Sequence, residues 1–222
     1  YAQTRLWFLH KYEGPSATYN IPLAVRLTGE IDAVALCAAI VDVVARHESL
    51  RTLFTESDGI PCQQVLAVED VDVPVVVTEV AAQGLAAAAI DAVGYRLDLA
   101  TEIPIRAELL RVSPTEHVLV VMIHHIAADG ASLVPLARDV ATAYTARLVG
   151  RAPDWAPLAV QYADYTLCGN KRSWAARTIP TASCPTNSLI GAPNWLMHPN
   201  TLRCPPIDPA PHNNHSAATR SR

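Results

Sequence analysis

The feature that most limits how this chain can fold is an uninterrupted apolar run at residues 118–123, which reads Val-Leu-Val-Val-Met-Ile. The run is too short to cross a membrane, and it is apolar at both odd and even positions. Successive side chains of a strand point to opposite faces of its sheet, so a strand of this composition has to be covered on both sides. We therefore predict a central strand in a sheet with helices packed against it.

The rest of residues 1–167 alternates short β-branched runs with longer stretches of helical spacing. The expected strands are residues 21–29, 60–68, 73–80 and 105–112, and the expected helices are residues 83–96 and 131–149. Asp32 is a suitable N-cap for one more helix. The apolar ladder of that helix continues toward Leu50 and contains Leu36, Ile40, Val44 and His47. The sequence thus predicts an α/β fold, an α+β two-layer arrangement with a mixed sheet flanked by helices.

The composition changes abruptly at residue 168. Residues 1–167 contain 11 basic and 20 acidic residues, whereas residues 168–222 contain 6 basic residues, a single acidic residue, no Val and eight of the 17 Pro. The second segment lacks the apolar periodicity needed to bury a face. We expect residues 1–167 to form a folded subdomain and residues 168–222 to be a Pro- and Asn-rich tail, either disordered or translated out of frame. A variable linker is the milder alternative.

Charge and cysteine usage exclude several function classes. The net charge of −4 and the pI near 6.0 give no basic surface for nucleic acid, and we see neither a signal peptide nor a membrane span. Five cysteines without a CxxC pair fit a reducing cytoplasm. Cys204, His212 and His215 are too few to suggest a metal site, so no metal is expected. The chain starts at Tyr1 without an initiator Met, which suggests a piece of a longer protein.

The chemically informative motif is HHIAADG at residues 124–130, directly after the central strand. Strand ends followed by a loop and a helix are common places for active sites. Each residue alone has a structural explanation, because a histidine beside an apolar strand is more often a hydrogen-bonded core residue than a catalyst. The full pattern arises by chance with a probability of roughly 10⁻³ in a chain of average composition. The combination therefore indicates a functional site.

This motif resembles the HHxxxDG signature of the condensation domains of nonribosomal peptide synthetases. Residues 1–9 (YAQTRLWFL), 46–54 (RHESLRTLF) and 162–167 (YADYTL) are similar to the first, second and fourth motifs of that family, in the right order. The fourth motif is expected to continue with Trp where this chain has Cys168. Residues 14–20 resemble the subtype that joins an L-residue donor to an L-residue acceptor.

The resemblance implies a fold, a reaction and roles for particular residues. The fold would be the N-terminal half of a domain related to chloramphenicol acetyltransferase, and the reaction would be amide formation between aminoacyl and peptidyl thioesters. His125 would be the catalytic histidine, accepting a proton from the attacking amine or stabilising charge. His124 would support its geometry. Gly130 would allow close approach of the substrate carbonyl or a turn that larger residues cannot adopt.

The resemblance also implies partners for the site. Asp129 is expected to be structural and to pair with an arginine, for which the candidates are Arg5, Arg46 and Arg51. No cofactor is expected to bind directly, because phosphopantetheine arms on partner carrier domains deliver the thioesters. Carrier domains and other synthetase modules are the expected partners, and no nucleic acid or membrane is.

Several alternatives remain open from the sequence. Arg46, Glu48 and Arg51 can be read as a solvated helix end, and the aromatic residues of the first motif as helix packing. The same signature also occurs in standalone thioester-dependent O-acyltransferases. A non-catalytic module that docks carrier proteins is a third reading. Because the motifs of the second half are not found after Leu167, we expect the chain to be inactive alone and to self-associate through its exposed half-domain face.

Overall fold

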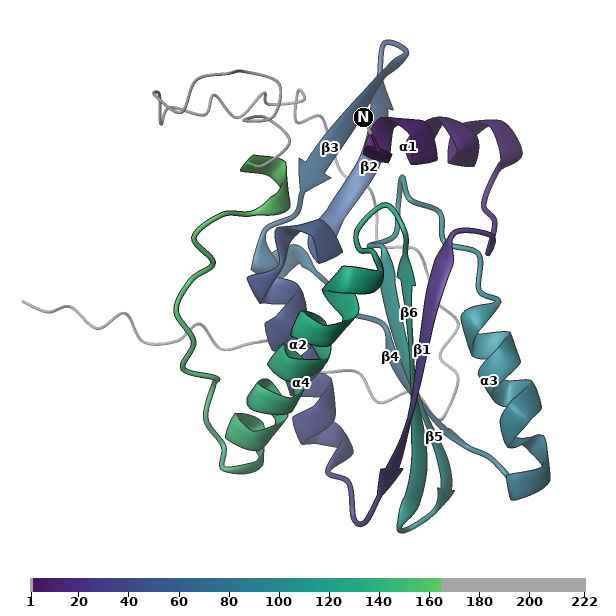
Figure 1. Ribbon diagram of the computed structural model, residues 1–222, viewed down its shortest axis with the longest axis vertical. Coiled ribbons are helices and arrows are strands. Elements are labelled where there is room, and N and C mark those ends of the chain that lie inside the picture. The colour runs from purple at the N-terminus through teal and green to yellow at the C-terminus, as the bar shows by residue number, and fades with distance from the viewer. Residues whose placement is uncertain (1, 165–222) are drawn as a thin grey trace, which may run out of the picture.

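The computed structural model describes residues 2–164, in which a four-stranded mixed sheet is the central feature (Figure 1). Its strand order is β1-β6-β5-β4. Strand β6 is antiparallel to both β1 and β5, whereas β4 is parallel to β5. The bounds of these strands are β1 Asn20–Thr28, β4 Val75–Glu79, β5 Ile105–Ser113 and β6 Glu116–His124. The predicted mixed sheet is confirmed.

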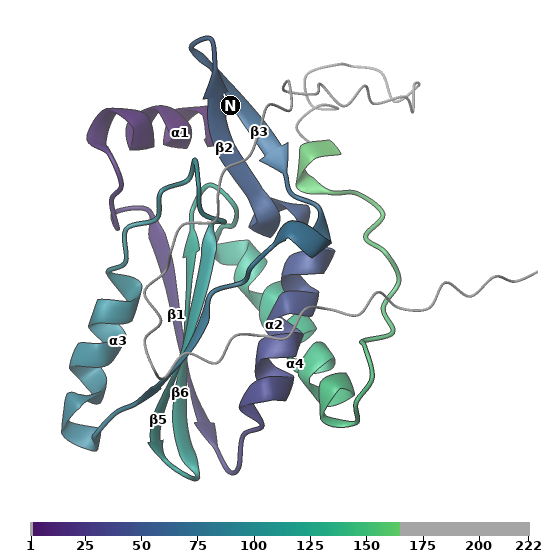
Figure 2. The ribbon, with the colours of Figure 1, turned by 180° about the vertical axis from the view of Figure 1, so that it is seen from behind.

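Helices cover both faces of this sheet. Helices α2 (Ala33–Arg46) and α4 (Leu133–Leu148) lie side by side on one face, and α3 (Leu85–Val93) lies on the other (Figures 1 and 2). Helix α1 (Ala2–Glu13) crosses one end of the sheet, next to a hairpin of β2 (Thr52–Ser57) and β3 (Ile60–Val65). The described residues also contain four short 3₁₀ helices, η1 Glu48–Arg51, η2 Val68–Asp70, η3 Ala82–Gly84 and η4 Gly130–Ser132.

The packing of β6 confirms the prediction made from its sequence. Leu119 and Ile123 belong to the core cluster under α2 and α4. Val118 and Val120, on the opposite face, pack with Leu110 against the apolar side of α3. All four side chains are buried. The strand that leads into the HHIAADG motif is therefore held from both sides.

Helix α2 follows the predicted pattern at its start but ends earlier than expected. The Asp32 carboxylate accepts a hydrogen bond from the Ala35 backbone N–H at 2.9 Å, and Leu36, Ile40 and Val44 are buried. The helix stops at Arg46, and the chain continues toward Leu50 through η1. His47 thus lies just past the helix and not on its core face.

Replacing Asp32 with alanine should lower the free energy of unfolding by about 1 kcal/mol, because the N-terminal N–H groups of α2 lose their acceptor. The measurement is urea denaturation followed by circular dichroism. Asp72 is a matched control, since it is an exposed aspartate outside any helix or strand, has no positive φ and caps no helix. Equal losses for Asp32→Ala and Asp72→Ala would contradict the capping role.

Strand β2 was missed by the sequence analysis, whereas its hairpin partner β3 lies within the strand expected at residues 60–68. Strand β2 begins in the segment assigned to the second motif, and the hairpin turn is Asp58-Gly59, both with positive φ (53° and 78°). An Asp-Gly pair in this conformation is a common two-residue hairpin turn. The other predicted elements are present, and their ends differ by up to three residues from those expected.

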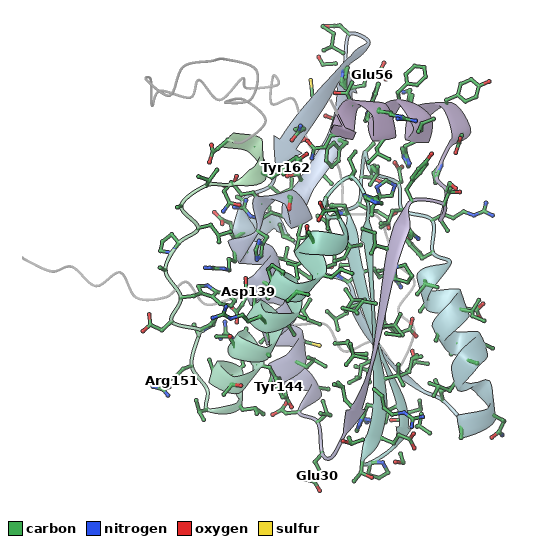
Figure 3. All side chains as sticks on the ribbon, in the orientation of Figure 1. Glu30, Glu56, Asp139, Tyr144, Arg151 and Tyr162 are labelled. Carbon is green, nitrogen blue, oxygen red and sulfur yellow. The ribbon has the colours of Figure 1, made fainter. Side chains whose placement is uncertain are left out.

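Two groups of ion pairs connect the C-terminal part of α2 to α4. In the first, the Arg147 guanidinium donates two hydrogen bonds to the Asp42 carboxylate, at 2.6 and 2.7 Å. In the second, Asp139 accepts from Arg46 Nε at 3.0 Å and lies 2.8 Å from His47 Nε2 (Asp139 is labelled in Figure 3). Because α4 begins directly after the HHIAADG motif, this second contact fixes the helix that leaves the candidate site.

The predicted tail, residues 168–222, lies outside the described residues, as do Cys168, Cys204, His212 and His215. The boundary between subdomain and tail therefore stays a prediction. Within residues 2–164, none of the helices is long and apolar enough to cross a membrane.

Candidate active site

The two histidines of the motif lie where β6 ends and have opposite environments. The His124 backbone N–H donates to the Pro104 carbonyl at 2.9 Å, and the His125 N–H donates to the Tyr19 carbonyl at 2.7 Å. The His124 side chain is buried, at 1% exposure, whereas His125 is exposed. The alternation of the strand thus places one imidazole inside the subdomain and presents the next at its surface.

His124 stabilises the turn through its ring. Its Nδ1 accepts a hydrogen bond from the Ile126 backbone N–H at 3.1 Å, and its backbone carbonyl accepts from the Ala127 N–H at 2.9 Å. Burial is the main cause that lowers the pKa of His124 to about 4, and repulsion from the nearby His10 and His125 contributes to this shift. At neutral pH the ring is therefore uncharged, as an Nδ1 acceptor has to be. The supporting role of His124 in the reaction stays a prediction.

Asp129 caps the 3₁₀ turn that leads into α4. Its Oδ1 accepts from the Ser132 backbone N–H at 2.9 Å and from Ser132 Oγ at 2.6 Å, while the Asp129 N–H donates back to Ser132 Oγ at 3.2 Å. The hydrogen bonds from Ser132 hold the pKa of Asp129 below its ordinary value. The expected ion pair between Asp129 and an arginine is not formed in residues 2–164, because the carboxylate is used as a helix cap.

The three candidate arginines lie elsewhere. Arg46 contacts Asp139, donates to the Ala156 carbonyl at 2.7 Å and stacks on Trp155, with its Cζ 4.8 Å from the ring centroid. Arg51 donates to the Leu66 carbonyl and lies 3.5 Å from the Glu48 carboxylate. Arg5 is exposed on α1. The second motif therefore joins α2, α4 and the segment after α4, and is more than a solvated helix end.

Gly130 does not need to be glycine for its backbone conformation. Its φ is not in the left-handed region, and a Cβ built on it meets no atom within 4 Å. The interpretation as a turn that larger residues cannot adopt is therefore wrong. The interpretation as a point of close substrate approach stays a prediction.

Residues far away in the sequence complete the environment of the motif. The rings of His10 and Tyr19 approach the buried His124, each with a ring-centroid distance of 6.2 Å; the His10 ring is perpendicular to that of His124 and the Tyr19 ring is tilted by 54°. Asn20 pairs with His124 across β1 and β6, and its side-chain amide donates to the Val93 and Tyr95 carbonyls. The sequence analysis did not select these residues individually. Their segments carried the first motif and the subtype resemblance, which was the available signal.

The arrangement is suited to proton transfer at a surface. The backbone around His125 is hydrogen-bonded on both sides, and its imidazole forms no hydrogen bond with the described residues. Such a ring can meet a substrate that approaches from outside the subdomain. Within residues 2–164, no three His, Cys, Asp or Glu side chains are grouped so that they could hold a metal ion.

Comparison with known proteins assigns the family. The condensation-domain family matches residues 1–173. The chain is 62% identical over 86% of its length to CymA, described as a probable non-canonical nonribosomal peptide synthetase, of Salinispora arenicola, and 56% identical over 86% to a dimodular nonribosomal peptide synthase of Bacillus subtilis. It covers 2% and 8% of these two relatives.

Solved structures of related domains have the same fold as the described part of this chain. The X-domain from teicoplanin biosynthesis has a TM-score of 0.68 and 38% identity, with 79% of this chain and 39% of that chain covered. The starter condensation domain of rhizomide synthetase has a TM-score of 0.63 and 25% identity, with 70% and 38% covered. The chain thus spans less than half of each of these two solved chains.

Proposed function

This chain belongs to the condensation-domain family of nonribosomal peptide synthetases, and we propose from that premise that it supplies the catalytic histidine of an amide-forming site. Members of this family work with carrier domains and other synthetase modules. The substrates we infer are an L-aminoacyl or peptidyl donor and an L-aminoacyl acceptor. Both would be thioesters on phosphopantetheine arms, and the arms would belong to the partner carrier domains and not to this chain.

The observation that supports this proposal is the pairing of a buried, neutral His124 with an exposed His125 on a fixed backbone. In the reaction, the amine nitrogen of the acceptor attacks the carbonyl carbon of the donor. The C–N bond forms, the C–S bond breaks, and the proton lost by the amine ends on the departing sulfur. The exposed imidazole of His125 carries that proton or stabilises the charge that develops during attack.

The test uses a chimera, because the described residues match only part of a solved condensation domain. Residues 1–164 replace the matching segment in the Bacillus subtilis synthase, which is 56% identical. Its carrier domains are loaded with L-aminoacyl groups, and amide product is detected by mass spectrometry. We expect product from L-donors and none from D-donors. A folded chimera that binds its loaded carrier domains but forms no amide would overturn the proposal.

A binding module without catalysis is the second candidate function. The observation that favours it is the likeness to the X-domain of teicoplanin biosynthesis, which has been solved in complex with OxyB (TM-score 0.70). For this chain, a binding role predicts that the chimera docks its loaded carrier domains normally but forms no amide, whether or not His125 is present. An O-acyltransferase would instead form an ester when the acceptor carries a hydroxyl in place of the amine. The predicted self-association of the half-domain stays a prediction.

Replacing Gly130 with alanine separates the backbone role of this residue from its role in the reaction. Because the conformation suits any residue and a Cβ has open space, we expect the stability of the chain to be unchanged or raised by up to about 1 kcal/mol. Product formation in the chimera should fall, since a methyl group would lie where the thioester carbonyl approaches. Thermal unfolding and product rate are measured on the same variant. A normal rate would show that the substrate does not approach Gly130.

A further inference from the structure

Helix α1 directs one face toward the turn that follows His125. Residues Gln3, Leu6, Trp7 and His10 recur at helical spacing along this face. Leu6 and Trp7 pack on the core cluster that contains Met122 and Ile126. The His10 ring lies next to the His124 ring in a T-shaped arrangement. The helix of the first motif therefore packs on the HHIAADG segment along its length.

Gln3 makes the polar contact on this face. Its side chain is buried, and its Nε2 donates to the Ile126 carbonyl at 3.0 Å, across 123 residues of sequence. Its Oε1 accepts in turn from Gln63 Nε2 on β3, at 2.9 Å. The two amides form a chain that runs from the hairpin, through α1, to the backbone immediately after His125.

The other hydrogen bonds in the turn show what the Ile126 carbonyl contributes to its conformation. The His125 N–H is bonded to the Tyr19 carbonyl and the Ile126 N–H to the His124 ring, so the backbone is fixed on the amino side of Ile126. The Gln3 amide fixes the carbonyl on its other side. Leaving a buried carbonyl without a hydrogen-bond donor costs more free energy than an average hydrogen bond contributes to stability.

We propose that Gln3 is a positioning residue for His125, and that the chain of amides from Gln63 through Gln3 to the Ile126 carbonyl keeps the catalytic turn in one conformation. Gln3 touches no substrate and acts only through this backbone. The effect of Gln3 on the reaction rests on the proposed function of His125. The effect of Gln3 on the order of the turn is independent of that function.

The structural part is tested in the full chain by hydrogen exchange of the His125, Ile126 and Ala127 amides, observed by NMR. Gln3→Leu should speed exchange at these amides by about tenfold while the amides of β5 and α2 keep their protection. Gln63→Leu removes only the outer amide and should have a smaller effect at the same positions. Gln64→Leu is the matched control, because no side-chain hydrogen bond is formed by the neighbouring Gln64 within the described residues.

Two results would overturn the proposal. One is unchanged exchange at the three amides in both Gln3→Leu and Gln63→Leu. The other is a uniform loss of protection over the whole subdomain, because that would show a general packing role. If Gln3→Leu does not fold, the Gln63→Leu variant decides the question with the same readout.

The kinetic consequence is measured separately in the chimera. Gln3→Leu should lower kcat by about tenfold with little change in KM for the carrier-bound thioester. The reason is that docking of the carrier domain is unaffected, whereas the His125 imidazole is no longer held in its productive orientation. If His125→Ala leaves amide formation intact, the proposed function fails but the exchange result stands. If exchange is unaffected while His125→Ala abolishes product, the positioning role of Gln3 fails alone.

Discussion

Replacing His125 with alanine is expected to lower amide formation by the chimeric domain by about 10²–10⁴-fold. The side chain is exposed and forms no hydrogen bond with the described residues, so its removal leaves the turn and the sheet intact. The loss therefore reports on the reaction. It is measured as the rate of product formation from carrier-bound thioesters, with circular dichroism and carrier affinity as controls for folding and docking.

A second variant separates proton transfer from orientation of the substrates. Asparagine at position 125 keeps a polar side chain that can hydrogen-bond, but it cannot take up a proton near neutral pH. If the imidazole carries the proton of the amine, His125→Asn and His125→Ala should be equally slow. If holding the amine and the carbonyl in line is enough, His125→Asn should stay within about tenfold of the unmodified chimera. Full activity of both variants would mean that His125 has no part in catalysis.

The core of the fold could be predicted from local patterns. The apolar sequence of Val118 to Ile123 required cover on both faces, and α2, α3 and α4 supply it. Asp32 could be read as a cap because capping depends on the next three residues alone. Asp129 and Ser132 are also spaced three residues apart, as the members of a capping box are. This spacing predicts a cap at Asp129 in place of an arginine partner.

The surroundings of the motif could not be derived in this way. The contact of Gln3 with the Ile126 carbonyl joins residues 123 positions apart, and the contact of Tyr19 with the His125 N–H joins the residue before β1 to the residue after β6. Neither is encoded in spacing, because each depends on how α1 and β1 are placed against β6. The resemblance indicated that the segments of Gln3 and Tyr19 mattered, and the structure showed which atoms are used.

Acidification is expected to destabilise the subdomain through His124. Its pKa is about 4 in the folded chain and about 6.5 when unfolded, so the unfolded state binds the proton more readily. Stability is therefore full above about pH 7, falls as the pH drops below 6.5, and stops falling below the folded pKa. This difference between the folded and unfolded pKa of His124 lowers the free energy of unfolding by about 3 kcal/mol on going from pH 7 to pH 4. This is a large fraction of the stability of an ordinary domain.

The groups that face His124 set the direction of this effect. Burial is the main cause, and His10 on α1 and His125 in the same motif add repulsion when they are protonated. Tyr19 is the remaining ring next to it. His10 also has a pKa lowered by burial, partly offset by Asp98, and so contributes with the same sign. Protonation of His124 would in addition remove the Nδ1 acceptor of the Ile126 N–H, which links the loss of stability to disorder of the turn that carries His125.

The measurement is the free energy of unfolding in urea at pH values from 7.5 to 4. Carboxylates titrate near the lower end of this range, so the unmodified chain is compared with His124→Asn, whose side-chain oxygen can accept from the Ile126 N–H but does not titrate. His124→Asn should be less stable at pH 7.5 and should lose about 3 kcal/mol less on going to pH 4. Parallel curves for the two proteins would show that His124 is not buried as a neutral ring, and the fixed geometry proposed for His125 would lose its basis.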